Sequence, residues 1–330
     1  MIATTSATET VETPLPATRK RSLNLGRVRD YAVLIFLLAL IVALSISTST
    51  FLTLDNFKNV LETATPLGMV ACAGTIVIVS GGLDLSAGAI FLVASILAAK
   101  VSNDVSPAVG IVAGLLVGCG LGAINGLLTT VGRVNPFVGT LGTMTAFGGL
   151  AVVLSGSGLI FIEDPAFGNV ADTQILGFAL STWLLVVVAL LCGFLLNRTI
   201  FGQHAFGTGG NLVAARLSGV PINRTLTYGY MLSGTVAALA GIIIAARTLS
   251  ISPAGGSALI FDALAAILIG GNSVFGGAGA IWRTMVGVLI ITLIANGFNL
   301  LGVDPIYQQV VSGILILVAV SSDAWVRRSN

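Results

Sequence analysis

The sequence predicts an all-α, polytopic membrane protein of about ten transmembrane helices, some of them short and broken by glycines. Of its 330 residues, 55% are hydrophobic and only 8% are charged, and the mean hydropathy is +1.03. An ordinary soluble domain has about 25% charged residues. Crossing a hydrocarbon core of about 30 Å takes about 20 apolar helical residues, so the chain has room for these spans and short loops. No large soluble domain fits beside them.

A polar segment precedes the first span. Residues 1–18 are rich in Thr, Ala, Glu and Pro and have no apolar periodicity, which predicts a disordered tail. A basic cluster follows directly before the first apolar run, at Arg19, Lys20, Arg21, Arg27 and Arg29. We therefore interpret 1–29 as a cytoplasmic tail with a juxtamembrane basic cluster, 30–325 as the transmembrane domain, and 326–330 as a cytoplasmic C-terminus.

Ten apolar stretches are predicted to span the membrane. They lie at about 31–48, 64–80, 87–101, 107–131, 136–155, 176–196, 226–246, 258–270, 281–301 and 306–324. With the N-terminus in the cytoplasm, every Lys and Arg except Lys58, Lys100 and Arg247 falls on the inner side. The positive-inside rule therefore predicts that both termini are cytoplasmic. The largest outer loop is 156–175, and the largest inner segment is 197–225.

Two glycine-rich breaks interrupt the apolar pattern. The first, GGLDLSAG, precedes the short span 87–101, and the second, GGNSVFGG, follows the short stretch 258–270. Their glycines match at a constant offset of 189 residues, Gly81, Gly82 and Gly88 with Gly270, Gly271 and Gly277. Breaks at corresponding places in two halves indicate a transport pathway, because irregular backbone is tolerated at membrane depth only where protein or water covers it. The alternative is a pair of tight turns at the membrane surface.

The span 107–131 carries an unbroken glycine ladder. It consists of Gly110, Gly114, Gly118, Gly122 and Gly126. Glycines at this spacing line one helix face and let a neighbouring backbone approach closely. The ladder therefore predicts helix packing, against a helix of the same chain or of a second copy.

Several kinds of chemistry are missing from the sequence. No GxxxxGK[ST] stretch occurs, so the chain is not expected to hydrolyse ATP. The single histidine, His204, has no neighbouring Cys or His, so no catalytic residue, metal ligand or cofactor is predicted. Apart from Lys100 at the outer end of the span 87–101, the spans hold only Asp262, Arg283 and Asp323 as charged residues, so no ion relay is visible. The basic residues form no separate domain, which predicts no nucleic-acid partner. We therefore expect that a partner protein provides the energy for transport, or that transport is passive.

The inner segment 197–225 is the predicted place for such a partner. Its core, GGNLVAARLSGVPINRT, offers Asn211 as an N-cap, continues as a short helix, and stops at Gly219 and Pro221. One apolar face would consist of Leu212, Val213 and Leu217. Docking to a motor subunit and a plain connector are equally compatible with this pattern.

Five stretches resemble, in order and at family spacing, the ribose-type permease subunits of bacterial ABC importers. They are GGLDLSAG, INGLLTTVGRVNPFVGTLGTM, GTGGNLVAARLSGV, GGNSVFGGAG and NLLGVDPIYQQVVSGILILVAV. The resemblance implies a multi-pass permease domain in the bacterial cytoplasmic (inner) membrane, surrounded by lipid, that pairs with a second copy as a homodimer. It also implies that a binding protein delivers a ribose-like pentose or a hexose, and that a separate ATPase subunit with two fused nucleotide-binding halves binds the ATP.

By the same resemblance, 197–225 is a cytoplasmic coupling loop that seats in the ATPase. The residues implied in coupling are Gly209, Gly210, Asn211, Ala215, Arg216, Ser218 and Gly219. The sequence departs from the family at Gln203, Ala278 and Ala280, where basic residues are usual, and at Arg283, where a glycine is common. These departures leave tight packing at the start of the span 281–301 as an open question.

Polar or aromatic residues on otherwise apolar spans are candidates for the pathway. They are Asn125, Phe137, Thr140, Thr143, Asn296 and Asn299. Hydrogen bonding between helices is an equally good explanation for each. Asp84 and Ser86 of the first break are further candidates.

The charge of Asp84 needs a particular place. An unpaired aspartate at mid-membrane costs about 2.5–3.5 kcal/mol, whereas a helix N-terminus returns only about 0.3–1 kcal/mol. We therefore expect Asp84 near the cytoplasmic surface or in a wet break, with Asp84 or Ser86 capping the span 87–101.

Other functions stay open at this point. The related ABC permeases for branched-chain amino acids or nucleosides share the architecture and the glycine breaks. An ATP-independent carrier or channel is an alternative from a different class, and a structural membrane scaffold is another.

Overall fold

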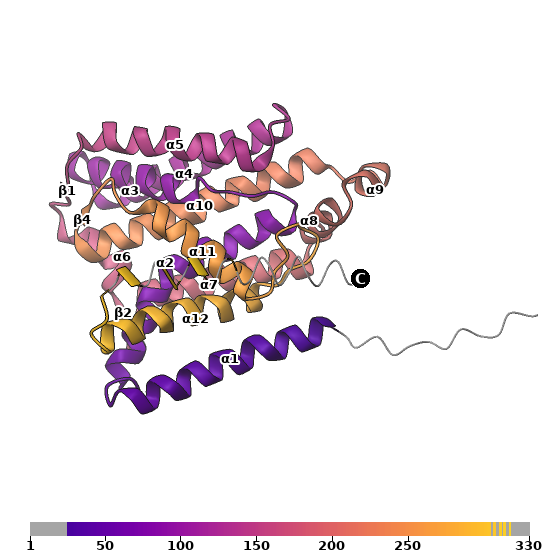
Figure 1. The fold of residues 1–330 in the computed structure, drawn as a ribbon. Coiled ribbons are helices and arrows are strands. Elements are labelled where there is room, and N and C mark those ends of the chain that lie inside the picture. Colours follow the sequence, from indigo (N-terminus) through magenta and orange to yellow (C-terminus); the bar gives the residue numbers. More distant parts are fainter. Residues whose placement is uncertain (1–24, 305, 308–309, 312, 315–316, 318–330) are drawn as a thin grey trace, which may run out of the picture.

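The computed structural model describes residues 25–304 and, beyond them, 306, 307, 310, 311, 313, 314 and 317. The described part is a bundle of long helices that lie side by side (Figure 1). In chain order the longer helices are α1 (Leu25–Ser47), α2 (Leu54–Val79), α3 (Ala87–Asp104), α4 (Pro107–Thr130), α5 (Pro136–Ser155), α7 (Leu180–Arg198), α8 (Ile200–Gly210), α10 (Ile222–Thr248), α11 (Gly256–Ile269) and α12 (Ile281–Leu300). The shorter elements are β1 (Ile160–Phe161), the 3₁₀ helix η1 (Pro165–Gly168), α6 (Asn169–Asp172), β2 (Gln174–Ile175), β3 (Phe178–Ala179), α9 (Leu212–Leu217) and β4 (Ser250–Ile251).

The all-α, polytopic membrane fold is confirmed. Among the described residues, seven helices are long and apolar enough to cross a membrane, namely α2, α3, α4, α5, α7, α10 and α12. Shorter apolar stretches lie in α1 and α11, at Val33–Ser47 and Ala258–Ile269. Every predicted span up to 281–301 overlaps one of these helices along most of its length. The predicted span 306–324 lies largely outside the described residues, as do residues 1–24 of the tail and the whole of 326–330.

Several predicted boundaries differ from the helices by four residues or more, and two of the differences have a clear local cause. The first turns of α2 carry charged residues and were left out of the span, but Thr53 caps them by accepting a hydrogen bond from the Asn56 amide at 3.3 Å. The start of α7 was placed too early, because β2 and β3 form a hairpin there. Its two turn residues, Leu176 and Gly177, both have positive φ, as a tight antiparallel hairpin requires.

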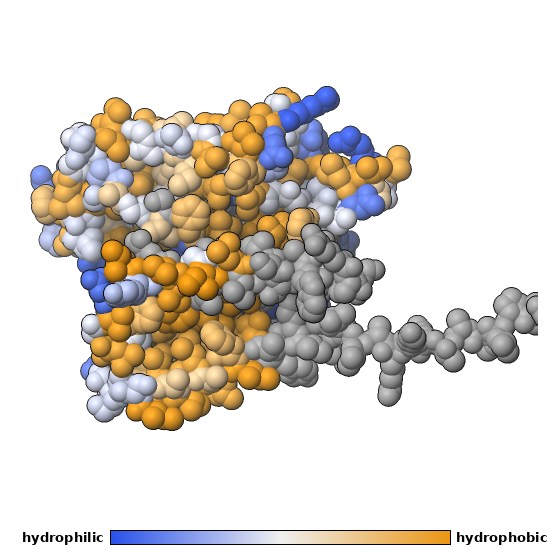
Figure 2. All heavy atoms as spheres, in the orientation of Figure 1, coloured by the Kyte–Doolittle hydropathy of each residue, from blue (hydrophilic) through white to orange (hydrophobic). Residues whose placement is uncertain are grey.

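The bundle has two chemically distinct ends. At the strand end, β1 pairs antiparallel with β4, and Arg247 forms a 3.0 Å ion pair with Glu62. At the opposite end, which we call the junction end, α2 and α11 terminate and α8 and α9 lie (Figure 1). On the face shown in Figure 2, hydrophobic residues cover much of the side of the bundle, and hydrophilic residues gather towards its two ends. This distribution is typical of a protein whose sides face lipid.

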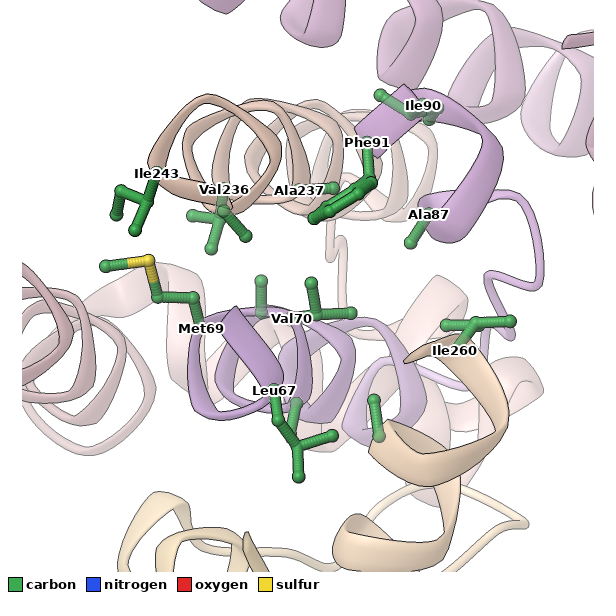
Figure 3. Close-up of a cluster of buried hydrophobic side chains, with 14 of the residues drawn as sticks. Leu67, Met69, Val70, Ala87, Ile90, Phe91, Val236, Ala237, Ile243 and Ile260 are labelled. Atoms are coloured by element: carbon green, nitrogen blue, oxygen red, sulfur yellow. The ribbon is translucent and has the colours of Figure 1, made fainter. Parts of the chain in front are cut away.

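The core lies where α2, α3, α10 and α11 meet. Figure 3 shows Met69 and Val70 of α2 facing Val236 and Ala237 of α10, with Phe91 of α3 beside them. These side chains are all buried. By contrast, α4 and α5 are largely exposed on their outward faces and carry apolar residues there. The helices around the glycine breaks are therefore the most enclosed part of the molecule.

Candidate functional site

The two glycine-rich breaks close with the same turn. After α2, the Gly81 amide donates to the Ile78 carbonyl and the Gly82 amide to the Val77 carbonyl, both at 2.9 Å. After α11, Gly271 donates to Leu268 at 2.9 Å and Asn272 to Ile267 at 3.2 Å. Gly81 and Gly271 both have φ of 84°. The predicted correspondence is therefore present in the structure, but Gly81 corresponds to Gly271, one residue away from the offset predicted from the sequence.

The backbones of three distant segments meet at what we call the glycine junction. It consists of Gly81, Gly209, Gly210, Gly276 and Gly277. The Gly277 amide donates to the Val79 carbonyl at 2.9 Å and so holds the second break against the end of α2. A methyl group built on Gly276 would lie 3.0 Å from the Gly81 Cα and 3.1 Å from the Gly209 Cα. Only glycine lets the end of α8 lie this close to both breaks.

The segment from α8 to α9 is helical almost throughout. Asn211 caps α9 by accepting a hydrogen bond from the Ala214 amide at 3.0 Å, as the sequence predicted. The helix ends at Leu217, followed by Ser218 and then Gly219, whose φ is 78°. Ala215 is the buried residue of α9, and Arg216 is exposed. The apolar face predicted for α9 is also exposed, at Leu212, Val213 and Leu217. In the described structure α9 therefore presents apolar surface outward.

Asp84 is buried, with 4% of its surface exposed, so its carboxylate does not face an open break in this conformation. Its expected place near the cytoplasmic surface of the membrane stays a prediction. Hydrogen-bond donors from the break and from α10 stabilise the buried carboxylate. Its Oδ1 accepts from the Ser86 amide at 3.0 Å and from the Ser86 hydroxyl at 2.7 Å. Its Oδ2 accepts from the Ser233 hydroxyl of α10 at 2.8 Å. A buried charge with several such donors avoids most of the cost of an unpaired one.

The capping prediction for the first break is met by Asp84. Its carboxylate accepts a hydrogen bond from the Ser86 amide directly before α3, whereas the Ser86 side chain makes no capping hydrogen bond. In the second break, Asn272 Oδ1 takes the Ala280 amide at 2.7 Å directly before α12. Each break thus uses one buried polar side chain to start the next helix.

The Asp84 contacts extend into a buried polar network. The Asn125 amide of α4 donates to the Ser86 hydroxyl at 2.6 Å, and the Thr143 hydroxyl of α5 donates to Asn125 Oδ1 at 2.7 Å. The Leu83 carbonyl of the break accepts from Tyr230 of α10 and from Thr140 of α5, each at 3.1 Å. The first break is therefore tied to three neighbouring helices by hydrogen bonds.

Most of the predicted pathway residues do not line an open path in this conformation. Asp84, Ser86, Asn125, Thr140 and Thr143 are buried in the network just described. Asn296 is also buried, and it exchanges two side-chain hydrogen bonds with Asn56 of α2, at 2.8 and 3.2 Å. These contacts are the helix–helix alternative that the sequence left open.

Phe137 and Asn299 are the two exposed pathway candidates. Phe137 lies in the first turn of α5, and Asn299 lies in the last turn of α12. The structure therefore does not bring them together with the buried network.

The glycine ladder of α4 packs against helices of the same chain. Methyl groups on Gly110 and Gly114 would meet α3, and those on Gly118, Gly122 and Gly126 would meet α10. For Gly114, the Ala94 carbonyl oxygen would be only 2.9 Å away, and for Gly126 the Thr227 Cα would be 2.7 Å away. The partner of the ladder, which the sequence left open, is thus internal.

The departures from the family pattern leave the α11–α12 contact tight. Arg283 stacks its guanidinium over the Trp282 ring at 5.5 Å. The close approach is made by Gly270 and Gly287, whose methyl positions would meet the backbones of Arg283 and Ala266. Ala278 and Ala280 instead engage through their backbones, with the Ala278 carbonyl accepting from Ser273 at 3.1 Å. Gln203 lies exposed on α8.

The sequence missed the glycine junction itself. Its segments lie far apart in the chain, and a composition rich in glycine gives no sign of which glycines meet. The positive φ of Gly81, Gly276 and Gly277 is a structural signal only.

Comparisons with known proteins agree with this architecture. Residues 56–320 match a family described as the permease component of branched-chain amino acid transport systems. The chain is 38% identical to the ribose import permease of Bacillus subtilis (strain 168), over 87% of this chain and 90% of that protein. It is 35% identical to the L-arabinose transport system permease of Escherichia coli (strain K12), over 94% and 95%. It is also 35% identical to a probable ABC transporter permease of Escherichia coli (strain K12), over 93% and 94%.

No solved structure matches the chain. The family model nevertheless covers most of it, and the sugar permeases align over nearly their whole length. The chain therefore belongs to this family of membrane-spanning permease components, together with the ribose-type permeases that its sequence resembles.

Proposed function

We propose that this chain is the permease subunit of an ABC importer that carries a monosaccharide across the bacterial cytoplasmic membrane. The similarity to ribose and arabinose permeases over most of the chain supports a pentose or hexose as the substrate. A partner ATPase provides the energy, since the sequence contains no phosphate-binding loop of the Walker type. The chain then needs no cofactor of its own.

The charges support an orientation with both termini and the junction end in the cytoplasm. Arg133, Arg216 and Arg224 all line one cavity at the junction end. Lys100 and Arg247 lie near the C-terminal ends of α3 and α10, at the strand end of the bundle. Since basic residues concentrate in cytoplasmic loops, the strand end faces outward. With the tenth span, 306–324, added, the chain crosses the membrane ten times.

The observation that carries the proposal is the route from α9 to the first break. The exposed apolar face of α9 suits insertion into an ATPase subunit with two fused nucleotide-binding halves. One residue, Asn211, separates α9 from α8, and the end of α8 packs backbone to backbone on Gly81 and Gly277. A displacement of α9 therefore reaches the break that the Asp84 network ties to α4, α5 and α10.

The remaining parts of the transporter follow from this arrangement. A sugar-binding protein docks at the strand end and releases its sugar to a path along the axis of a permease homodimer. The buried network describes a closed state, in which Asn125 and Thr143 satisfy each other. ATP binding shifts the α9 segments of both copies and opens this path to the binding protein.

The test is uptake by a strain from which the gene has been deleted. Labelled pentoses and hexoses are offered to the deletion strain, to the complemented strain, and to a strain carrying Arg216→Glu. We expect the deletion strain to lose uptake of one monosaccharide, and only the strain complemented with the wild-type chain to regain it. Unchanged uptake of every monosaccharide would contradict the sugar assignment.

The matching family is described by branched-chain amino acid transport, so labelled leucine and a nucleoside belong in the same assay. Loss of leucine or nucleoside uptake with normal sugar uptake would move the chain to that substrate class. Transport by the purified chain alone in liposomes would instead indicate an ATP-independent carrier.

A further inference from the structure

A large cavity lies at the junction end, between α9 and the connection from α4 to α5. Its volume is about 1220 Å³. One wall is formed by 131–136, and the opposite wall by α9 and the start of α10. The floor contains Ser80, Gly81, Thr208 and Gly209, so the cavity reaches the glycine junction. An object that fills it touches the backbone on which the first break rests.

Three arginines line this cavity from segments that are distant in the sequence. Arg133 follows α4, Arg216 lies in α9, and Arg224 lies in the first turn of α10. All three are exposed. Among the described residues, none of these three arginines has a carboxylate within ion-pairing distance, whereas Arg247 pairs with Glu62 at the other end of the bundle. The cavity is therefore strongly basic, with apolar patches at Leu212 and Phe275.

The wall that carries Arg133 has a defined shape. The Gly132 amide donates to the Leu127 carbonyl at 3.0 Å, and the Val134 amide donates to the Leu128 carbonyl at 3.1 Å. Asn135 then caps α5 by accepting from the Phe137 amide at 3.0 Å. Between these bonds Arg133 has φ of 54°, which a non-glycine residue adopts at a cost of about 1–2 kcal/mol. The guanidinium is thus presented from a fixed turn across the cavity from α9.

We propose that this cavity receives a carboxylate-bearing segment of the ATPase subunit, so that the docking surface includes 131–136 as well as α9. The inference rests on the proposed function, because it assumes that α9 docks an ATPase. Charge complementarity carries it: in the part of the chain that the structure describes, the three guanidinium groups have no carboxylate partners, which favours an acidic partner surface. The cavity is also continuous with the exposed apolar face of α9, which docks in the same event.

This surface gives the ATPase two contacts with different effects. Insertion of α9 moves the end of α8, and the acidic segment presses directly on the cavity floor at Gly81 and Gly209. Both contacts reach the glycine junction. A soluble protein fits the site better than a lipid headgroup, because 131–136, α9 and the connection from α9 to α10 form much of the lining, beyond the ends of the long helices α4 and α10.

Charge reversal tests the inference. The variants are Arg133→Glu and Arg224→Glu. The matched control is Lys100→Glu, which places the same change at an exposed residue near the end of α3, outside the cavity and outside the coupling loop 197–225. Each full-length chain is placed in nanodiscs and titrated with the ATPase subunit that copurifies with the wild-type chain. We expect each of the first two variants to bind about tenfold more weakly, and the control to stay within about twofold of wild type. Added salt should weaken wild-type binding and have less effect on a variant that combines Arg133→Glu with Arg224→Glu.

A photoreactive amino acid at position 133 identifies the occupant. A crosslink to an Asp- or Glu-containing peptide of the ATPase supports the proposal. A crosslink to phosphatidylglycerol would overturn it and identify an anionic lipid as the occupant. Equal ATPase binding by all variants would also overturn it. A crosslink to residues 1–24 of the same chain would overturn it as well.

The design separates this inference from the proposed function. A Val213→Asp variant that loses ATPase binding while Arg133→Glu retains it contradicts only the cavity assignment. If no ATPase binds the wild-type chain, the proposed function fails with it.

Discussion

Gly277→Ala is expected to destabilise the protein through the glycine junction. Gly277 has φ of 70°, and an alanine there pays about 1–2 kcal/mol for the left-handed conformation. Its methyl group would also lie 2.5 Å from the Gly210 Cα and 2.7 Å from the Gly210 nitrogen. Both neighbours are backbone atoms, so relief requires movement of α8, and overpacking of this kind costs about 1–3 kcal/mol more.

The matched control is Gly156→Ala at the end of α5. Gly156 has φ of 64°, but no atom of the described residues lies within 4 Å of its methyl position. It therefore carries the conformational cost alone, about 1–2 kcal/mol. The free energy of unfolding of both purified variants is measured by SDS titration in mixed micelles. The expected result is a larger loss for Gly277→Ala, by about 1–3 kcal/mol. Equal losses would refute the claim that three backbones pack tightly at the junction.

Three further substitutions test the buried contacts. Asp84→Ala leaves the Ser86 and Ser233 donors unpaired and should lower the free energy of unfolding by about 1–3 kcal/mol. Asp84→Asn keeps an acceptor and should lose less stability in thermal denaturation, and equal losses for the two variants would contradict this. The Gly118→Val side chain would clash with Ala238 and Gly234 and should reduce the folded fraction in size-exclusion chromatography. Gly120→Val, whose Cβ would have no described atom within 4 Å, should behave as wild type. A lower folded fraction for Gly120→Val than for Gly118→Val would disprove the internal ladder contact. Asn296→Leu breaks the amide pair with Asn56 of α2 and should lower the free energy of unfolding by about 0.6–2 kcal/mol without changing which sugar is transported. An altered sugar preference at full stability would instead indicate that Asn296 lines the pathway.

Local features could be predicted from the sequence because each depends on neighbouring residues. Hydropathy placed the spans, and the Asn211 cap with Gly219 beyond it placed α9. The regular glycine spacing of α4 indicated a packed face, since helix periodicity puts these residues on one side. The predicted break at 81–88 was also correct in position.

Contacts between distant segments could not be predicted in the same way. The burial of the Asp84 carboxylate was not predicted, because its donor Ser233 lies 149 residues further along the chain and no sequence pattern links the two. The meeting of Gly81, Gly209 and Gly277 depends on how three helices cross. Likewise, Asn296 looked like a pathway group because a single sequence does not show that Asn56 faces it.

The central claim is that an ATPase acting on α9 drives a monosaccharide through this chain. The most direct measurement is ATP-dependent uptake of a labelled monosaccharide into proteoliposomes that contain the chain with its copurifying ATPase and binding protein. The account predicts uptake that requires all three proteins and ATP, and that is lost with Val213→Asp in α9. Uptake that persists without the ATPase, or full activity of the Val213→Asp variant, would contradict it.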